Sequence, residues 1–214
     1  DVAGTGNNQV ATIDISALGT AYGTSDGDTN YNPYVDVGPT TDFSVLALPT
    51  TDDQIQFEDL IMFAINFGQV SRPVGLDVAA FNELEIMAPH TLVEDERVSI
   101  PIRMAADGTL QGLSVTVGWD QDVLEYSGYT DGDLMDRNGA PVFSAAAGVI
   151  DAAVLGRSGQ GLSGEGVLAT LHFRVRSSGD PGLVIEEIDA RNRDNEKVTL
   201  DGRVIGDTPT NQAV

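Results

Sequence analysis

GVLATLHFRVR (166–176) is a run of apolar and β-branched residues with the length of a β-strand, and it belongs to a series of similar runs. The others are LEIMAP (84–89), RVSIPIRM (97–104), LSVTVGW (113–119), VLEYSGY (123–129), GVIDAAVLG (148–156) and LVIEEIDAR (183–191). Turn signals such as Asp107-Gly108 and Asn138-Gly139 separate the runs. Seven short strands at this spacing are typical of a β-sandwich, so we predict a mostly β fold with a small α part.

The α part is predicted by an internal repeat that precedes the strands. QVATIDISALGTAYG (9–23) and QIQFEDLIMFAINFG (54–68) align without gaps at a period of 45 residues. In each copy an aspartate, Asp14 or Asp59, precedes an apolar run that ends at an aromatic residue and a glycine. These are helix start and stop signals, and they predict helices over 13–22 and 58–67.

The charge of the chain is strongly acidic and unevenly distributed. There are 33 acidic and 11 basic residues, a net charge of −22, and residues 1–71 hold ten carboxylates and no Lys or Arg. Such a chain repels phosphate backbones and anionic lipids, which argues against nucleic acid or membrane partners. We also expect no membrane insertion, because no apolar run approaches the ~18 residues needed to span a bilayer. Cysteine is absent, which excludes disulfides and thiolate metal sites.

The acidic repeat predicts two calcium sites, because calcium prefers six to eight oxygen ligands arranged along a tight loop that leads into a helix. Asp14 and Asp59 stand where such a helix begins, and each follows a candidate oxygen ligand by seven residues. The predicted ligands are Asp1, Asn7, Gln9 and Asp14 at the first site, and Asp36, Asp42, Asp52, Gln54, Gln56 and Asp59 at the second. The alternative is a set of solvated acidic loops whose aspartates only cap helices.

Residues 1–68 resemble a dockerin module. The resemblance rests on the two loop-helix copies and on GDTNYNPYVDVGP (27–39), which is similar to the connector of dockerin repeats in secreted proteins. It departs from that family in its loop insertions and in Ala3, where an acidic ligand is expected. The resemblance implies a module that calcium holds in shape and that binds a cohesin, a β-sandwich, through its helix faces. On those faces the expected partner-binding residues are Thr12, Ile13, Phe57 and Glu58.

Residues 84–200 resemble a cohesin, a jelly-roll sandwich. The resemblance is carried by three stretches: LEIMAPHTLVEDERVSIPIRM (84–104), GLSVTVGWDQDVLEYSGYTDGDL (112–134) and GEGVLATLHFRVRSSG (164–179). Carbohydrate-binding modules with a similar jelly roll remain an alternative. We therefore predict a dockerin-like module (1–70), a connector (71–83), a cohesin-like sandwich (84–203) and a tail (204–214).

Two features of the sandwich favour a protein partner over a sugar. Trp119, its one tryptophan, is expected in the core and not on an aromatic platform. FSAAAGVIDAAVLG (143–156) is small and apolar in both strand parities, which suits either a flat surface that a helix approaches closely or a strand buried on both sides.

No enzymatic activity is expected. Neither His90 nor His172 belongs to a nucleophile or metal-ligand constellation. The sequence instead predicts a secreted or cell-surface interaction protein whose partners are cohesin- or dockerin-bearing proteins. Copies could associate head to tail into a filament, or the helical module could pack on its own sandwich. A third hypothesis is a carbohydrate-binding component of a polysaccharide-degrading system.

Overall fold

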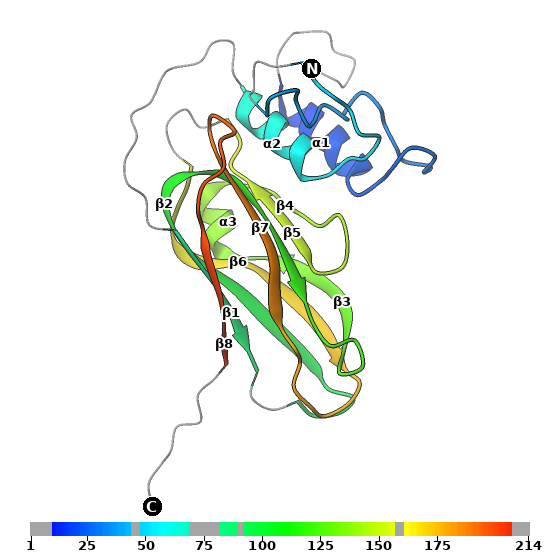
Figure 1. The fold of residues 1–214 in the computed structure, drawn as a ribbon, viewed down its shortest axis with the longest axis vertical. Helices are drawn as coiled ribbons and strands as arrows, with labels where there is room; N and C mark the ends of the chain where they lie inside the picture. The colour runs from blue at the N-terminus through cyan, green and yellow to red at the C-terminus, as the bar shows by residue number, and fades with distance from the viewer. Residues whose placement is uncertain (1–9, 44–47, 69–81, 90–91, 157–160, 207–214) are drawn as a thin grey trace, which may run out of the picture.

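The computed structural model describes residues 10–43, 48–68, 82–89, 92–156 and 161–206 (Figure 1). Two helices come first, eight strands follow, and a third helix lies between the third and fourth strands. The elements are α1 (Thr12–Ala21), α2 (Phe57–Asn66), β1 (Glu83–Ala88), β2 (Arg97–Gly118), β3 (Leu124–Asp131), α3 (Asp133–Asn138), β4 (Val142–Phe143), β5 (Val149–Ala153), β6 (Leu162–Val175), β7 (Val184–Asn192) and β8 (Asp201–Gly206). The predicted mostly β sandwich is confirmed.

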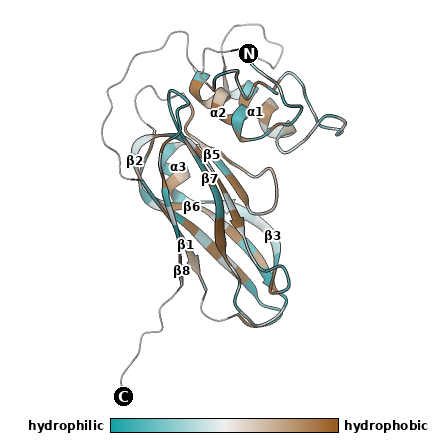
Figure 2. Cartoon of the chain, viewed as in Figure 1, coloured by the Kyte–Doolittle hydropathy of each residue, from teal (hydrophilic) through white to brown (hydrophobic). Residues whose placement is uncertain are grey.

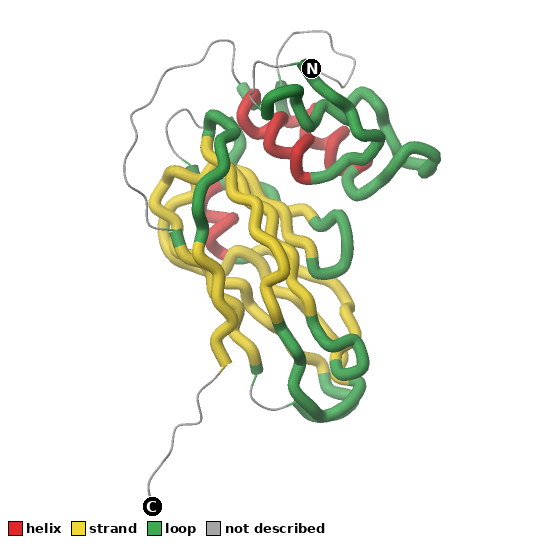
Figure 3. The backbone as a smooth tube through the Cα atoms, in the orientation of Figure 1, coloured by secondary structure: helices red, strands yellow, loops and turns green. Residues whose placement is uncertain are grey.

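The long strand β2 belongs to both layers of the sandwich (Figure 3). Its first half pairs with β1 and β6, which gives a first sheet in the order β8-β1-β2-β6-β3. Its second half pairs with β5 and β7, and β4 extends β5, which gives a second sheet in the order β7-β2-β5-β4. Between the halves Gly108 has φ 94° at an irregularity in the pairing, a conformation that favours glycine.

The sandwich core is formed by alternate residues of the two sheets. Ile100 and Ile102 from the first half of β2, and Leu113 and Val115 from the second half, are all fully buried. The predicted core position of Trp119 is confirmed, since it packs against this core and its Nε1 donates to the Leu124 carbonyl at 3.0 Å. Figure 2 shows the resulting alternation of apolar and polar residues along the strands.

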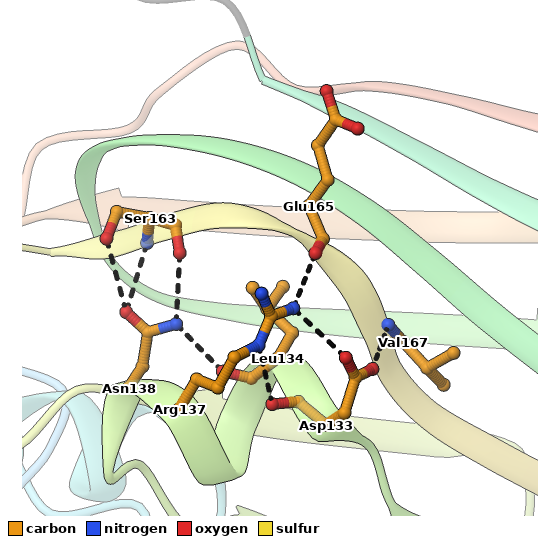
Figure 4. A network of polar contacts seen from close by, with 7 residues as sticks. All are labelled: Asp133, Leu134, Arg137, Asn138, Ser163, Glu165 and Val167. Carbon is orange, nitrogen blue, oxygen red and sulfur yellow. Dashed lines mark hydrogen bonds and ion pairs between the residues drawn. The ribbon is translucent and has the colours of Figure 1, made fainter.

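Helix α3, which the sequence did not predict, is fixed to β6 by polar side chains (Figure 4). The side-chain amide of Asn138 donates to the carbonyls of Leu134 (2.8 Å) and Ser163 (3.1 Å), and its oxygen accepts from the Ser163 amide (3.2 Å). At the other end of the helix, Asp133 accepts from the Val167 amide at 2.8 Å. These bonds satisfy backbone groups where β6 has no strand partner on that side.

The helices α1 and α2 form a unit with its own small core, which we call the helical pair (residues 10–43 and 48–68). Leu18 of α1 and Ile55 and Leu60 of the second repeat copy are fully buried in it. The two copies make matching hydrogen bonds: the Gly68 amide donates to Val10 and the Gly23 amide donates to Ile55, each at 2.8 Å. The unit therefore has approximate two-fold symmetry that follows the 45-residue repeat.

The helices lie one residue before the predicted ranges, at 12–21 and 57–66. The predicted strands at 97–104 and 113–119 are parts of one strand, β2. The sandwich also continues beyond the predicted boundary at 203, because β8 pairs in parallel with β1 as far as Gly206. Most of the predicted connector, residues 71–81, lies outside the described residues.

Candidate functional site

The helical pair lies at one end of the sandwich, against the second sheet (Figures 1 and 3). Helix α2 approaches the sheet closely: a Cβ built on Gly112 of β2 would lie 3.0 Å from Cδ1 of Ile61. The Gly156 amide, just after β5, donates to the Ala64 carbonyl at 3.2 Å, and Ala153 of β5 is buried in the core of the helical pair. We call this contact the junction.

The end of α1 makes a second contact, with β4 and the loop that follows it. The rings of Tyr22 and Phe143 lie 4.8 Å apart, centroid to centroid. A Cβ built on Gly23 would lie 2.9 Å from the Ala145 carbonyl oxygen, so the backbones meet closely there. The flat, small-residue surface predicted for 143–156 is thus the surface on which a helix end rests.

A third contact joins the loop between α1 and α2 to the end of β7. The Asn195 side chain donates to the Phe43 carbonyl, and the Arg191 guanidinium lies 5.9 Å from the centroid of the Phe43 ring. Arg191 also makes two hydrogen bonds of 2.7 Å with Asp189, so its charge is already paired. Three separate contacts therefore fix the helical pair on the sandwich.

A cleft of about 450 Å³ lies at the junction and is strongly acidic. Among its lining residues are five carboxylates and one basic residue, Arg191. The carboxylates are Asp52 and Glu58 from the helical pair, and Asp151, Glu187 and Asp189 from the second sheet. Burial raises the pKa of Glu58 to about 7, and the negative charges of Asp52 and Asp151 raise it further. Burial also raises the pKa of Asp151.

Of the predicted calcium ligands, Asp59 is fully buried and accepts three backbone hydrogen bonds. Its Oδ1 accepts from the amides of Val37 (2.6 Å) and Gly38 (2.8 Å), and its Oδ2 accepts from Gln56 (2.9 Å). Burial raises the pKa of Asp59 to about 7, against the opposite effect of these bonds. Asp14 is also buried, and its Oδ2 accepts from the Ala11 amide at 2.9 Å. Both aspartates thus cap their helices.

Asp36 is the residue that best fits a bound cation. It is 3% exposed, and its Oδ2 accepts from the Tyr31 hydroxyl (2.8 Å) and the Asp53 amide (3.0 Å). Its Oδ1 is buried and has no hydrogen-bond partner within the part of the chain that the structure describes. A buried, unpaired carboxylate oxygen is costly, and a cation at this position would satisfy it.

The other predicted ligands are only partly brought together. Asp52 accepts from the Gln54 amide (3.1 Å), and the Gln54 side chain accepts from that of Gln56 (3.1 Å). Asp42 lines a different hollow, beside Arg191 and Lys197. Asp1, Asn7 and Gln9 lie outside the described residues. Across residues 10–43, 48–68, 82–89, 92–156 and 161–206, no three His, Asp or Glu side chains are close enough together to hold a metal.

The predicted partner-binding residues fall into two groups. Phe57 and Glu58 line the junction cleft, so this helix start contacts a sandwich in the same chain. Thr12 and Ile13, at the equivalent positions of α1, are exposed, Ile13 by 51%. Sequence reasoning did not single out Tyr22, Phe143 or Asp151, although the first two lay in stretches already marked as a helix end and a contact surface.

The histidines form no catalytic arrangement where the structure describes them. His172 lies on the first sheet, its Nδ1 3.0 Å from the Ser99 hydroxyl and its Nε2 3.1 Å from that of Thr130. His90 lies outside the described residues. None of the helices described is long and apolar enough to cross a bilayer.

Comparison with known proteins identifies the sandwich. The cohesin domain profile matches residues 84–204. Solved structures similar to this chain include a non-cellulosomal cohesin from Archaeoglobus fulgidus, with 18% identity, coverage of 59% of this chain and 88% of that chain, and a TM-score of 0.43. A type I cohesin–dockerin complex from Clostridium thermocellum gives 11% identity, coverage of 63% and 99%, and a TM-score of 0.46. The sixth cohesin of scaffoldin B from Acetivibrio cellulolyticus, in complex with a Cel5 dockerin, gives 18%, 60%, 96% and 0.43.

No curated protein matches the chain. The matched range begins after the helical pair and covers more than half of the 214 residues. This chain belongs to the cohesin domain family.

Proposed function

We propose that this chain is a non-catalytic interaction protein of an extracellular assembly, in which a dockerin-like helical pair is a ligand of the cohesin sandwich. Cohesin domains are non-catalytic modules that bind other proteins. The observation that carries the proposal is the junction, where Ile61 meets Gly112 and Tyr22 meets Phe143. A helical unit seated on the sandwich surface is the kind of contact that such a module makes.

Calcium is proposed as the structural cofactor of the helical pair. At the second site Asp36, Asp52 and Asp59 would hold it together with oxygens of Gln54 and Gln56. Its charge would offset the repulsion among carboxylates in a segment without Lys or Arg. The support is the buried, unpaired Oδ1 of Asp36. The first site is proposed from the repeat, through Asp14 and its equivalence to Asp59.

Contact within one chain and contact between chains are two uses of the same surfaces. If the helical pair of one copy docks on the sandwich of the next, the contact is heterologous and builds an open fibre or a closed ring. The junction supports docking within the chain, while the exposed Ile13 leaves the equivalent face of α1 available to a second copy. Self-association through that face is our proposal for the assembly.

Small-angle X-ray scattering tests the docking. The wild-type chain should be compact, and Ile61→Asp, which places a carboxylate against Gly112, should increase the radius of gyration while the sandwich stays folded by circular dichroism. Ile13→Asp is the matched control on the equivalent face of α1 and should leave the radius unchanged. A wild-type chain already as extended as Ile61→Asp would contradict the proposal.

Crosslinking of two differently labelled populations tests the assembly, with size exclusion in calcium and in chelator. Mixed crosslinked species in calcium that disappear in Ile13→Asp support contact between chains. A monomer in both conditions overturns self-association and leaves docking within the chain intact.

A further inference from the structure

The helical pair is nearly symmetric, so it presents two similar faces to a sandwich. Helices α1 and α2 are offset by the 45-residue repeat, and Gly23 and Gly68 donate matching bonds of 2.8 Å to Ile55 and Val10. A rotation that exchanges the two copies would bring α1 to the place of α2 on the second sheet. The structure shows one of these orientations, so something at the junction must distinguish the two faces.

One asymmetry lies where the end of α1 meets Phe143. Gly19 lies there, and a Cβ built on it would be 3.1 Å from Cε1 of Phe143. The equivalent residue of the second copy is Ala64, which carries the methyl group that Gly19 lacks. In the reverse orientation Phe143 would have to move by a few tenths of an ångström to admit it.

The larger asymmetry is Tyr22, whose equivalent is Phe67. Tyr22 stacks on Phe143 with a 4.8 Å centroid separation, and Phe143 is the direct cross-strand neighbour of Asp151. Neighbours of this kind have their Cβ atoms about 5 Å apart on the same sheet face. The hydroxyl end of Tyr22 is therefore brought to the carboxylate of Asp151, and that carboxylate raises the pKa of Tyr22, after the larger effect of burial.

Asp151 is a buried carboxylate in need of a donor. It is 1% exposed, and neither of its oxygens makes a hydrogen bond of normal geometry to the described residues. The Tyr22 hydroxyl is likewise buried and unpaired among them. Ser114 lies opposite Asp151 in the sheet, and Glu58 approaches from α2 with a like charge. A small rotation of the Tyr22 hydroxyl toward Asp151 satisfies two costly groups at once.

We propose that Asp151 selects the orientation of the helical pair on the second sheet by accepting a hydrogen bond from Tyr22, which Phe67 cannot make in its place. The inference rests on the proposed docking of the helical pair. In the reverse orientation a phenyl ring would cover Asp151 and leave a buried acceptor without a donor, at a cost of roughly 1–3 kcal/mol. That corresponds to a preference of about tenfold to a hundredfold.

Glu58 acts against this selection. The reverse orientation would put Ile13 in its place and remove a carboxylate from beside Asp151. The hydroxyl of Tyr22 and the small Gly19 therefore have to outweigh a charge effect of opposite sign.

Paramagnetic relaxation measured by NMR on the full chain tests the proposal. The chain has no cysteine, so Ala146→Cys, next to the Gly23 contact, carries a single spin label. In this labelled parent the amides of Thr20–Gly23 should broaden and those of Ile65–Gly68 should not. Tyr22→Phe should lower the ratio of the two orientations by about tenfold or more, so that both sets broaden. Tyr22→Phe/Phe67→Tyr should move the broadening to Ile65–Gly68.

The controls separate the possible failures. Tyr34→Phe removes a hydroxyl from a residue that is 75% exposed and should change nothing. Asp151→Leu removes the need for a donor, so adding Tyr22→Phe to it should have little further effect. One-sided broadening that survives Tyr22→Phe unchanged would overturn the selection by Asp151. No broadening at either end in the labelled parent would instead overturn the docking itself.

Discussion

Glu58 of α2 and Asp151 of β5 line the same cleft from opposite sides of the junction, and the charge of Asp151 raises the pKa of Glu58. Burial is the larger cause, and together the causes bring that pKa to about 7. Arg191, the one basic residue among the cleft-lining residues described, is engaged by Asp189. The junction therefore holds together despite a like-charge pair that no basic side chain offsets.

The first prediction is that stability falls as the pH rises through this range. Between the ordinary Glu pKa of 4.5 and about 7, the folded chain keeps a proton on Glu58 that the unfolded chain has released. The folded state then binds more protons, so the free energy of unfolding decreases with rising pH. Asp59, with a pKa of about 7, acts in the same direction. Urea unfolding in chelator from pH 4.5 to 7.5 measures the slope.

Glu58→Gln should reduce that slope and leave the part due to Asp59. Glu94→Gln removes one carboxylate from an exposed turn and serves as the control for net charge. An equal slope in wild type and Glu58→Gln would contradict the assignment of a raised pKa to Glu58.

The second prediction concerns calcium at Asp36. Asp36→Asn keeps the size of the side chain and an acceptor for Tyr31, but it removes the charge from the buried, unpaired oxygen. We expect calcium affinity at the second site to fall about tenfold or more, because ligand charge sets affinity in oxygen-coordinated sites. Calorimetric titration measures the affinity and the stoichiometry, which should be two for wild type. Asp26→Asn makes the same charge change at an exposed position, and an equal loss there would point to long-range attraction in place of coordination.

The third prediction separates helix capping from metal binding at Asp14 and Asp59. Each accepts a hydrogen bond from a backbone amide three residues earlier, at 2.9 Å. Replacement by Ala should therefore cost about 1 kcal/mol or more in chelator, from the lost cap alone. In calcium the loss should be larger, because binding energy is also folding energy. Thermal unfolding in both conditions decides between them, and equal losses would leave the aspartates as caps without a metal role.

Sequence periodicity placed the elements well but could not place the junction. Helices ending at Tyr22 and Phe67 were predicted to within one residue, because apolar spacing and a closing glycine are local signals. The shared strand β2 was divided in two, because the irregularity near Gly108 resembles a turn. The meeting of Tyr22 with Asp151 joins residues far apart in sequence, and no local pattern encodes such a pair. Asp151 itself lay inside a small apolar run, where a lone carboxylate was the signal that a buried donor was needed.

The fourth prediction tests the polar attachment of α3 to β6. Asn138→Ala should cost about 2–3 kcal/mol, because it removes three hydrogen bonds and leaves the Ser163 amide and carbonyl without that partner (Figure 4). Arg137→Ala, on the same helix, removes a partly exposed ion pair with Asp133 and should cost less than about 1 kcal/mol. Similar losses for the two variants would show that the attachment depends on helix propensity and not on Asn138.

The fifth prediction is an energetic coupling between Tyr22 and Phe143, whose rings lie 4.8 Å apart with an interplanar angle of 31°. Stacked aromatic pairs contribute about 0.5–1.5 kcal/mol beyond the area that they bury. In a double-mutant cycle with Tyr22→Leu and Phe143→Leu, the double variant should be less destabilised than the sum of the singles by about that amount. The same cycle with Tyr34→Leu in place of Tyr22→Leu should be additive, since Tyr34 is 75% exposed. Additivity in the first cycle would mean that the helical pair spends most of its time away from β4, because two side chains that seldom meet cannot share energy.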